Sequence, residues 1–152
     1  MLDLYEELGA IVNALEERGI EYALCGGLAM AVHGFVRATV DIDLLVPADQ
    51  ANAIEQAVAP LGYIIKALPM RFSGGGVEIR RVSKIDSTDG DTMTLDLLLV
   101  SPATEDVWSS RQRLTWRGRA VAVVAREGLV KLKRFRSSRQ DLADIERLES
   151  GE

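Results

Sequence analysis

Hydrophobic residues recur at helical spacing near the start of the chain. Over residues 3–18, leucine, isoleucine and valine return every three or four positions, and Gly19 follows directly. This period places apolar side chains on one face, so it predicts an amphipathic helix that ends at the glycine. We expect further helices over residues 49–60, 126–136 and 138–148.

Short apolar runs bounded by glycine, proline or acidic residues predict buried strands. A short helix over residues 28–33 separates the first two strands, and Arg117-Gly118 predicts a hairpin turn between the last two. We expect a single α/β (α+β) domain over residues 1–152. Its mixed sheet is flanked by helices, with a core over about 1–125 and a C-terminal helical pair over about 126–149. The predicted strands are residues 22–25, 41–46, 62–68, 77–82, 94–100, 114–116 and 120–124.

Carboxylates interrupt two of these strands. Asp41 and Asp43 begin one of them, and positions two apart on a strand project from the same face. Such close like charges are unfavourable unless something neutralises them. Asp96 stands alone in an apolar strand, where a buried carboxylate must be paired or metal-bound. If the strands are neighbours, the three acids form a Mg²⁺ site that can hold two ions for phosphoryl or nucleotidyl transfer.

An Asp-x-Asp pair alone is more often an exposed pair at a strand end, so its surroundings matter. Gly26-Gly27 lies at a strand-to-helix junction, where glycine lets the backbone approach a phosphate. Lys131, on a predicted helix, can face a triphosphate as a point charge. Asp141 can cap the last helix or orient Lys131. Arg37 reaches the triphosphate or makes a surface ion pair, two equally weighted alternatives.

These residues carry a family resemblance. Cys25-Gly-Gly-Leu-Ala-Met-Ala-Val-His-Gly34, followed by Asp41-Ile-Asp-Leu-Leu-Val46, resembles the nucleotidyltransferase superfamily typified by DNA polymerase beta. More narrowly, the chain resembles the minimal bacterial branch related to AbiE-type toxins. That branch shares a late lysine and an Arg-x-Asp-x-x-Asp helix, matched here by Lys131, Arg139, Asp141 and Asp144.

The resemblance implies a role for each matched residue. Asp41, Asp43 and Asp96 would bind two Mg²⁺ ions, and Asp96 would also activate the incoming hydroxyl. Lys131 would contact phosphate as part of the catalytic set. Many members have Gly-Ser where this chain has Gly-Gly, so only backbone N–H groups remain there for the phosphate. The nucleotide-binding set expected from the residues and the resemblance is Gly26, Gly27, Arg37, Lys131 and Asp141.

The predicted function is Mg²⁺-dependent transfer of a nucleoside monophosphate from a nucleoside triphosphate, such as ATP, to a hydroxyl. The acceptor is an RNA or tRNA 3′ end, a protein or a small molecule such as an aminoglycoside. A toxin–antitoxin setting, with AMP transfer onto a partner toxin, is the rival enzymatic interpretation. The alternative from another class is a non-catalytic, antitoxin-like module that binds nucleotide or a partner. The three acids, the Gly-Gly turn and Lys131 together favour the enzyme.

Composition narrows the setting. One cysteine and one histidine exclude an internal disulfide, a cysteine-rich zinc site and a multi-histidine metal site. The acidic start of the chain and the lack of a long apolar run predict a cytoplasmic protein without a membrane partner. We expect His33 to bond the backbone rather than to act chemically.

Charge is unevenly distributed, although the net charge is -5. Residues 1–100 carry 7 Lys and Arg against 15 Asp and Glu, whereas residues 101–152 carry 11 against 8. The basic stretch from Arg111 to Arg139 is either a face for nucleotide and RNA or a solvated surface that balances the acidic part of the chain. The two alternatives stay open at this point.

Overall fold

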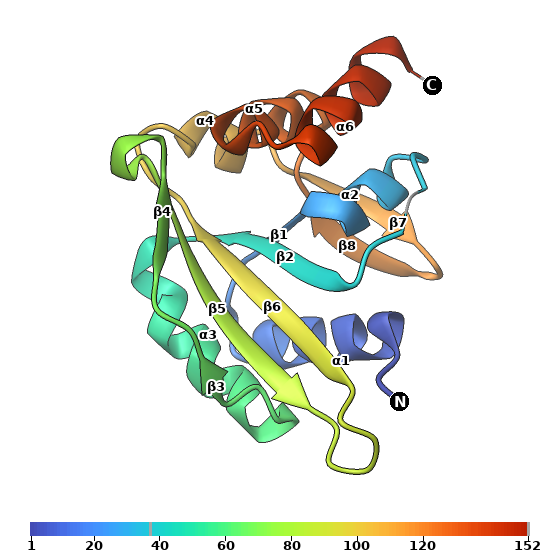
Figure 1. Cartoon of the computed structure of the whole chain (residues 1–152), viewed down its shortest axis with the longest axis vertical. Coiled ribbons are helices and arrows are strands. Elements are labelled where there is room, and N and C mark those ends of the chain that lie inside the picture. The colour runs from blue at the N-terminus through green and yellow to red at the C-terminus, as the bar shows by residue number, and fades with distance from the viewer. Residues whose placement is uncertain (37, 152) are drawn as a thin grey trace.

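A mixed sheet with helices on both of its faces forms the centre of the molecule (Figure 1). The structure is a computed structural model that describes residues 1–36 and 38–151. Within these residues the sheet has eight strands in the order β3-β5-β6-β2-β1-β8-β7, and β4 pairs with β5. The strands are β1 (Ala23–Cys25), β2 (Asp41–Val46), β3 (Ile65–Lys66), β4 (Met70–Phe72), β5 (Val77–Ile85), β6 (Thr92–Leu99), β7 (Gln112–Trp116) and β8 (Arg119–Val123).

Side-chain caps define the starts of the first and last helices. Asp3 accepts a hydrogen bond from the backbone N–H of Glu6, and Ser138 forms a capping box with Asp141. Short 3-10 turns, η1 (Ala48–Gln50), η2 (Ala59–Leu61) and η3 (Ser73–Gly75), flank α3 and β4. The helices are α1 (Leu4–Glu17), α2 (Gly26–Val32), α3 (Ala51–Val58), α4 (Glu105–Ser109), α5 (Arg126–Arg136) and α6 (Arg139–Ser150).

The two acid-bearing strands lie side by side, as the sequence analysis required. β2 and β6 pair in parallel, with Asp43 directly opposite Asp96 and Asp41 opposite Thr94. β1 runs antiparallel to β2, and β5 runs antiparallel to β6. The mixed sheet flanked by helices and the C-terminal helical pair are therefore confirmed.

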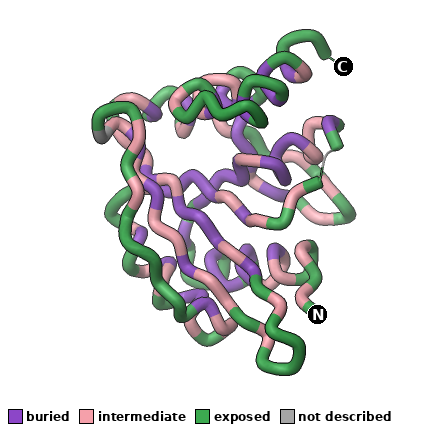
Figure 2. Tube along the Cα trace, in the orientation of Figure 1, coloured by how far each residue is buried: buried purple, intermediate pink, exposed green. Residues whose placement is uncertain are grey.

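Alternation along β2 and β6 separates a core face from a cavity face. Ile42, Leu44, Leu95 and Leu97 are fully buried, and the central strands are the most buried part of the sheet (Figure 2). Asp41 and Asp43 occupy the intervening positions and project from the other face. The sheet thereby holds the acids rigidly over a packed core.

Some sequence-based boundaries differ from the structure. The strand expected over residues 62–68 shortens to β3, because Gly62 takes a positive φ of 105° at the end of η2. β4 and α4 were not predicted, since each is too short to show a period. No helix in the described part of the chain is long and apolar enough to span a membrane.

Candidate active site

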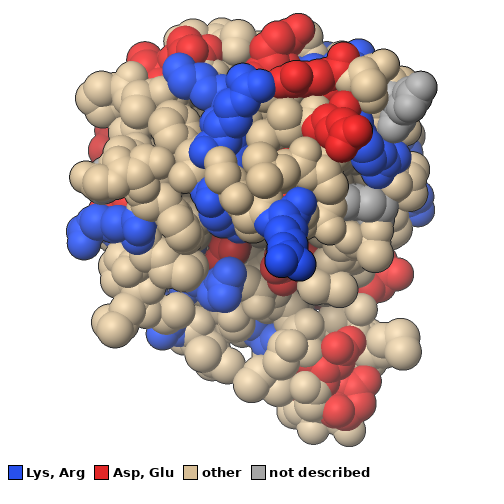
Figure 3. All heavy atoms as spheres, turned by 45° about the horizontal axis from the view of Figure 1, so that its top comes forward, with Lys and Arg blue, Asp and Glu red and all other residues tan. Residues whose placement is uncertain are grey.

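A cavity of about 360 Å³ opens above the acid-bearing strands. Its floor is formed by β2, β6 and β5, and its walls by α2, α5 and the start of α6. Figure 3 shows acidic atoms recessed in a hollow among basic side chains. The charged lining residues are Asp41, Asp43, Arg81, Asp96, Lys133, Arg136 and Asp141.

The three strand carboxylates repel one another. Burial raises the pKa of Asp43, and the nearby charges of Asp96 and Asp41 raise it further, so that together they bring it to about 7. Burial and Asp96 also raise the pKa of Asp41. Folding therefore brings together carboxylates that need a positive charge between them, as the sequence analysis expected.

Gly26 allows Asp43 to lie against the backbone at the start of α2. Gly26 has φ +66°, and a Cβ placed on it would lie 2.1 Å from Asp43 Oδ2. Only glycine accommodates both the conformation and this contact. Gly26 and Gly27 line the same cavity as the acids, so the structure brings this predicted nucleotide-binding turn and the predicted metal ligands together.

Arg81 is a cavity residue that sequence reasoning missed. It lies opposite Asp96 on the neighbouring strand β5. Its Nε donates to Asp96 Oδ1 at 2.7 Å and its NH2 group donates to Oδ2 at 2.9 Å. This forked contact raises the pKa of Arg81. In the sequence, Arg81 stands two residues after Ile79 and four after Val77, so the three share one face of the strand. This pattern identifies Arg81 as a partner of Asp96 only once β5 is known to pair with β6.

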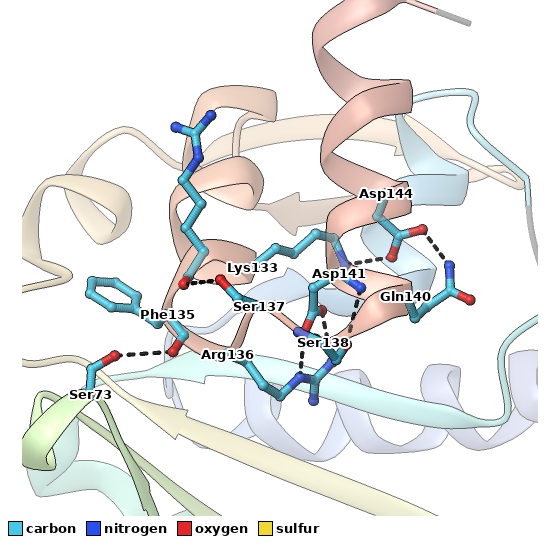
Figure 4. Close-up of polar contacts among 10 residues, drawn as sticks. Ser73, Lys133, Phe135, Arg136, Ser137, Ser138, Gln140, Asp141 and Asp144 are labelled. Carbon is cyan, nitrogen blue, oxygen red and sulfur yellow. Dashed lines mark hydrogen bonds and ion pairs between the residues drawn. The ribbon is translucent and has the colours of Figure 1, made fainter.

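Lys131 does not enter the cavity, and this corrects the sequence-based placement. Its Nζ donates to both carboxylate oxygens of Asp106 at 2.8 Å on the exposed surface. Lys133 lines the cavity instead and is buried, with Nζ 3.0 Å from Asp144 Oδ2 (Figure 4). Residues two apart on a helix point in nearly opposite directions, because each residue turns it by about 100°. Lys133 follows Leu129 by four positions, and this spacing on the buried face could have identified it.

Asp141 caps α6 and holds Arg136 rather than orienting Lys131. Its Oδ2 accepts from Arg136 Nε at 2.8 Å and from the Ser138 hydroxyl at 2.7 Å (Figure 4). Burial alone would raise the pKa of Asp141, but these donors hold it at about 2. Asp141 therefore stays ionised and fixes Arg136 at the wall of the cavity.

The acids suit a divalent cation by their chemistry, since Mg²⁺ prefers carboxylate oxygens. In residues 1–36 and 38–151, however, no group of three or more histidine, cysteine, aspartate or glutamate side chains is arranged to hold a metal. Both oxygens of Asp96 are already bound by Arg81. Asp41 and Asp43 have the donor chemistry for such a cation, and Arg81 would have to release Asp96 for it to join them.

Two other sequence interpretations have an outcome, and a third lies outside the described residues. His33 Nε2 lies 2.8 Å from the carbonyl of Val124, which confirms the structural role expected for it. Cys25 is buried in the core, also as expected. Arg37 lies outside the described residues.

The basic stretch is largely neutralised by acids from elsewhere in the chain. This favours the interpretation that it balances the acidic residues over the interpretation that it is a nucleic-acid face. The pairs are Arg111–Glu21, Arg113–Glu16, Lys131–Asp106, Lys133–Asp144, Arg134–Glu149 and Arg136–Asp141.

Comparison with protein families identifies the chain. The family model for aminoglycoside-2''-adenylyltransferase matches residues 7–148. The chain belongs to this family. This member of the aminoglycoside-2''-adenylyltransferase family is a nucleotidyltransferase, which confirms the superfamily and the enzyme class expected from the sequence. A comparison with curated proteins gave no match.

Solved structures show that this adenylyltransferase-family chain shares their fold. The lincomycin-bound lincosamide antibiotic adenylyltransferase LnuA has TM-score 0.62 and 18% identity, with 95% of this chain and 96% of that chain covered. ANT(2'')-Ia in complex with adenylyl-2''-tobramycin has TM-score 0.64 and 15% identity, covering 95% and 86%. The solution structure of ANT(2'')-Ia has TM-score 0.63 and 16% identity, covering 96% and 82%.

Proposed function

We propose that the chain transfers AMP from ATP to a hydroxyl of a small molecule. The observation that carries this proposal is the alignment of Asp41, Asp43 and Asp96 beside Gly26-Gly27 in one cavity. The family, and the antibiotic acceptors named for the similar structures, support a small-molecule acceptor.

Mg²⁺ would be held by Asp41 and Asp43, with Asp96 joining after Arg81 releases it, and would supply positive charge to the phosphates. The donor chemistry and the raised pKa of Asp43 support this assignment. Both features mean that a bound cation would lower the free energy of the ionised carboxylates in the folded chain.

Asp96 would act as the base. Its carboxylate would accept the proton of the acceptor hydroxyl, whose oxygen bonds to the α-phosphorus as the bond to pyrophosphate breaks. The guanidinium of Arg81 keeps the Asp96 carboxylate oriented until substrate arrives. A carboxylate whose direction is fixed before the substrate binds meets the geometric need of this step.

Lys133 and Arg136 provide the cationic wall opposite the acids. Both line the cavity, and both lower the pKa of Asp43 through their charge, which places them within electrostatic reach of it. The triphosphate would therefore lie between this wall and the Asp41–Asp43 pair, with the backbone of Gly26-Gly27 beside it. Lys133 takes the phosphate role that the sequence analysis assigned to Lys131.

The other acceptors receive less support from the structure. An RNA or tRNA acceptor would need a basic surface, and most cations of the stretch Arg111 to Arg139 are paired with acids. The protein acceptor, the toxin–antitoxin partner, the AbiE-type branch, the antitoxin-like alternative and the cytoplasmic location stay predictions.

The direct test uses ATP labelled at the α-phosphate, Mg²⁺ and a panel of hydroxylated small molecules. Asp43→Asn and Asp96→Asn should each lower label transfer by about a hundredfold or more. Asp106→Asn is the matched control, because this surface acid lies outside the cavity lining and its side-chain partner is Lys131. Transfer that persists in Asp43→Asn and Asp96→Asn would refute the proposal.

A further inference from the structure

The cavity has an apolar side that the nucleotide chemistry leaves unused. Along the sheet, Gly26-Gly27 follows β1, and the acids lie on the next strands, β2 and β6. Beyond Asp96 come β5 and β4, which carry only one charged residue, Arg81, into the cavity lining. If the triphosphate lies at the glycines, the acceptor must approach from the β5–β4 side, because Asp96 stands between them.

Hydrocarbon covers this acceptor side. Val77, Ile79 and Arg81 are two residues apart and share one face of β5. Leu132 from α5 and Phe72 from β4 are half-buried in the lining. The described residues that form this apolar wall are Phe72, Val77, Ile79, Leu98, Leu129, Leu132 and Phe135.

A hydrogen bond connects the strand part and the helix part of the apolar wall. The hydroxyl of Ser73, in η3, donates to the backbone carbonyl of Phe135 at 3.1 Å (Figure 4). This bond ties the β4–β5 connection to the end of α5, so strand and helix contribute to one wall. The whole cavity, acids and apolar wall together, has a volume of about 360 Å³, which is within the size range of small-molecule sites.

The carboxylates of the described lining are already engaged. Asp96 is bound by Arg81 and Asp141 by Arg136, and Asp41 and Asp43 are the proposed cation ligands. A polycationic acceptor would need additional acids to pair with its ammonium groups, since unpaired buried charges are costly. The described residues lining the cavity supply none.

The geometry points to an acceptor that is uncharged or singly charged and presents an apolar face to the wall formed by β4, β5 and α5. This inference rests on the proposed function, because that function places the acceptor beside Asp96. It departs from the polycationic acceptors for which the family is named.

Binding tests the inference separately from catalysis. The chain, loaded with Mg²⁺ and a non-hydrolysable ATP analogue, is titrated with an uncharged alkyl glycoside, with lincomycin, which carries one basic amine, and with tobramycin, which carries several. Calorimetry measures affinity, and methyl NMR follows Val77 and Ile79. We expect the first two ligands to bind at least tenfold tighter than tobramycin and to shift both methyl signals.

Two substitutions at Leu132 make the test specific. Leu132→Glu should weaken the glycoside and lincomycin about tenfold and strengthen tobramycin, because it adds the missing carboxylate. Leu132→Ala should weaken the apolar ligands without helping tobramycin. Leu142→Glu is the control, since Leu142 is 55% exposed on α6 and does not line the cavity. Thermal melting confirms that each variant is folded.

The outcomes separate the two proposals. Tighter binding of tobramycin to the wild-type chain, or failure of both apolar ligands to bind, overturns the inference. Shifts of Val77 and Ile79 caused by the ATP analogue alone, with no acceptor binding, also overturn it, since the adenine would then cover the wall. Selective apolar binding to the loaded chain, with no AMP transfer from labelled ATP in the separate transfer assay, would uphold the ligand class and reject the proposed function.

Discussion

Replacing Gly26 by alanine tests the contact that locates Asp43. The new Cβ would lie 2.1 Å from Oδ2, 2.8 Å from Cγ and 2.9 Å from Cβ of Asp43. All three distances are shorter than real contacts, so Asp43 or the start of α2 must move. The φ of +66° adds backbone strain, because side chains disfavour the left-handed region.

The expected cost combines these two effects. Left-handed backbone costs roughly 1–2 kcal/mol for a residue with a side chain. Overpacking adds about 1–3 kcal/mol, so Gly26→Ala should lower the free energy of unfolding by about 2–5 kcal/mol. For a chain of this length, each kcal/mol corresponds to about 2–4 °C, which predicts a fall in Tm of roughly 4–20 °C.

Gly90→Ala is the matched control, because Gly90 has φ +76° and a Cβ added to it would meet no atom within 4 Å. It should incur only the backbone cost of roughly 1–2 kcal/mol. Urea denaturation monitored by circular dichroism measures both variants. The double variant Gly26→Ala/Asp43→Ala should recover about 1–2 kcal/mol, because two of the three short contacts disappear. Equal destabilisation by Gly26→Ala and Gly90→Ala, or strict additivity in the double variant, would refute the proposed packing.

Three further predictions concern the charges of the cavity. The pKa of Asp43 is raised to about 7, so the metal-free folded chain keeps a proton that the unfolded chain loses near pH 4. The stability gained from this proton is lost as the pH rises through about 7. Asp43→Asn should remove about 1–3 kcal/mol of that decline in urea titrations at pH 5 and pH 8. Arg81→Ala leaves the charge of the Asp96 carboxylate without its partner and should destabilise the chain by about 1–3 kcal/mol. In calorimetric melting, Mg²⁺ should restore most of this loss. An unchanged Tm without Mg²⁺ would contradict the pairing. Lys133→Met breaks a buried pair and should cost about 3–5 kcal/mol in denaturation, whereas Lys131→Met should change stability little. Initial-rate kinetics should show a raised KM for ATP in Lys133→Met and little change in Lys131→Met, and the reverse order would identify Lys131 as the phosphate ligand.

Local patterns predicted much of the fold. The period of apolar residues located α1, and both α5 and β2 were predicted with their observed bounds. The same-face geometry of Asp41 and Asp43 follows from strand alternation alone. Short or irregular elements such as β4 and α4 were missed, because three to five residues carry too little periodicity.

The sequence by itself determined the acids, the Gly26-Gly27 turn and the resemblance to nucleotidyltransferases, since each depends on neighbours along the chain. Only the tertiary structure decided that Arg81 binds Asp96, because that contact needs β5 to pair with β6 in one register. It also decided that Lys133 and not Lys131 lines the cavity, because the packing of α5 sets which side of the helix faces it. The apolar wall of the cavity has the same origin, because its residues come from separate strands and a helix that meet only on folding.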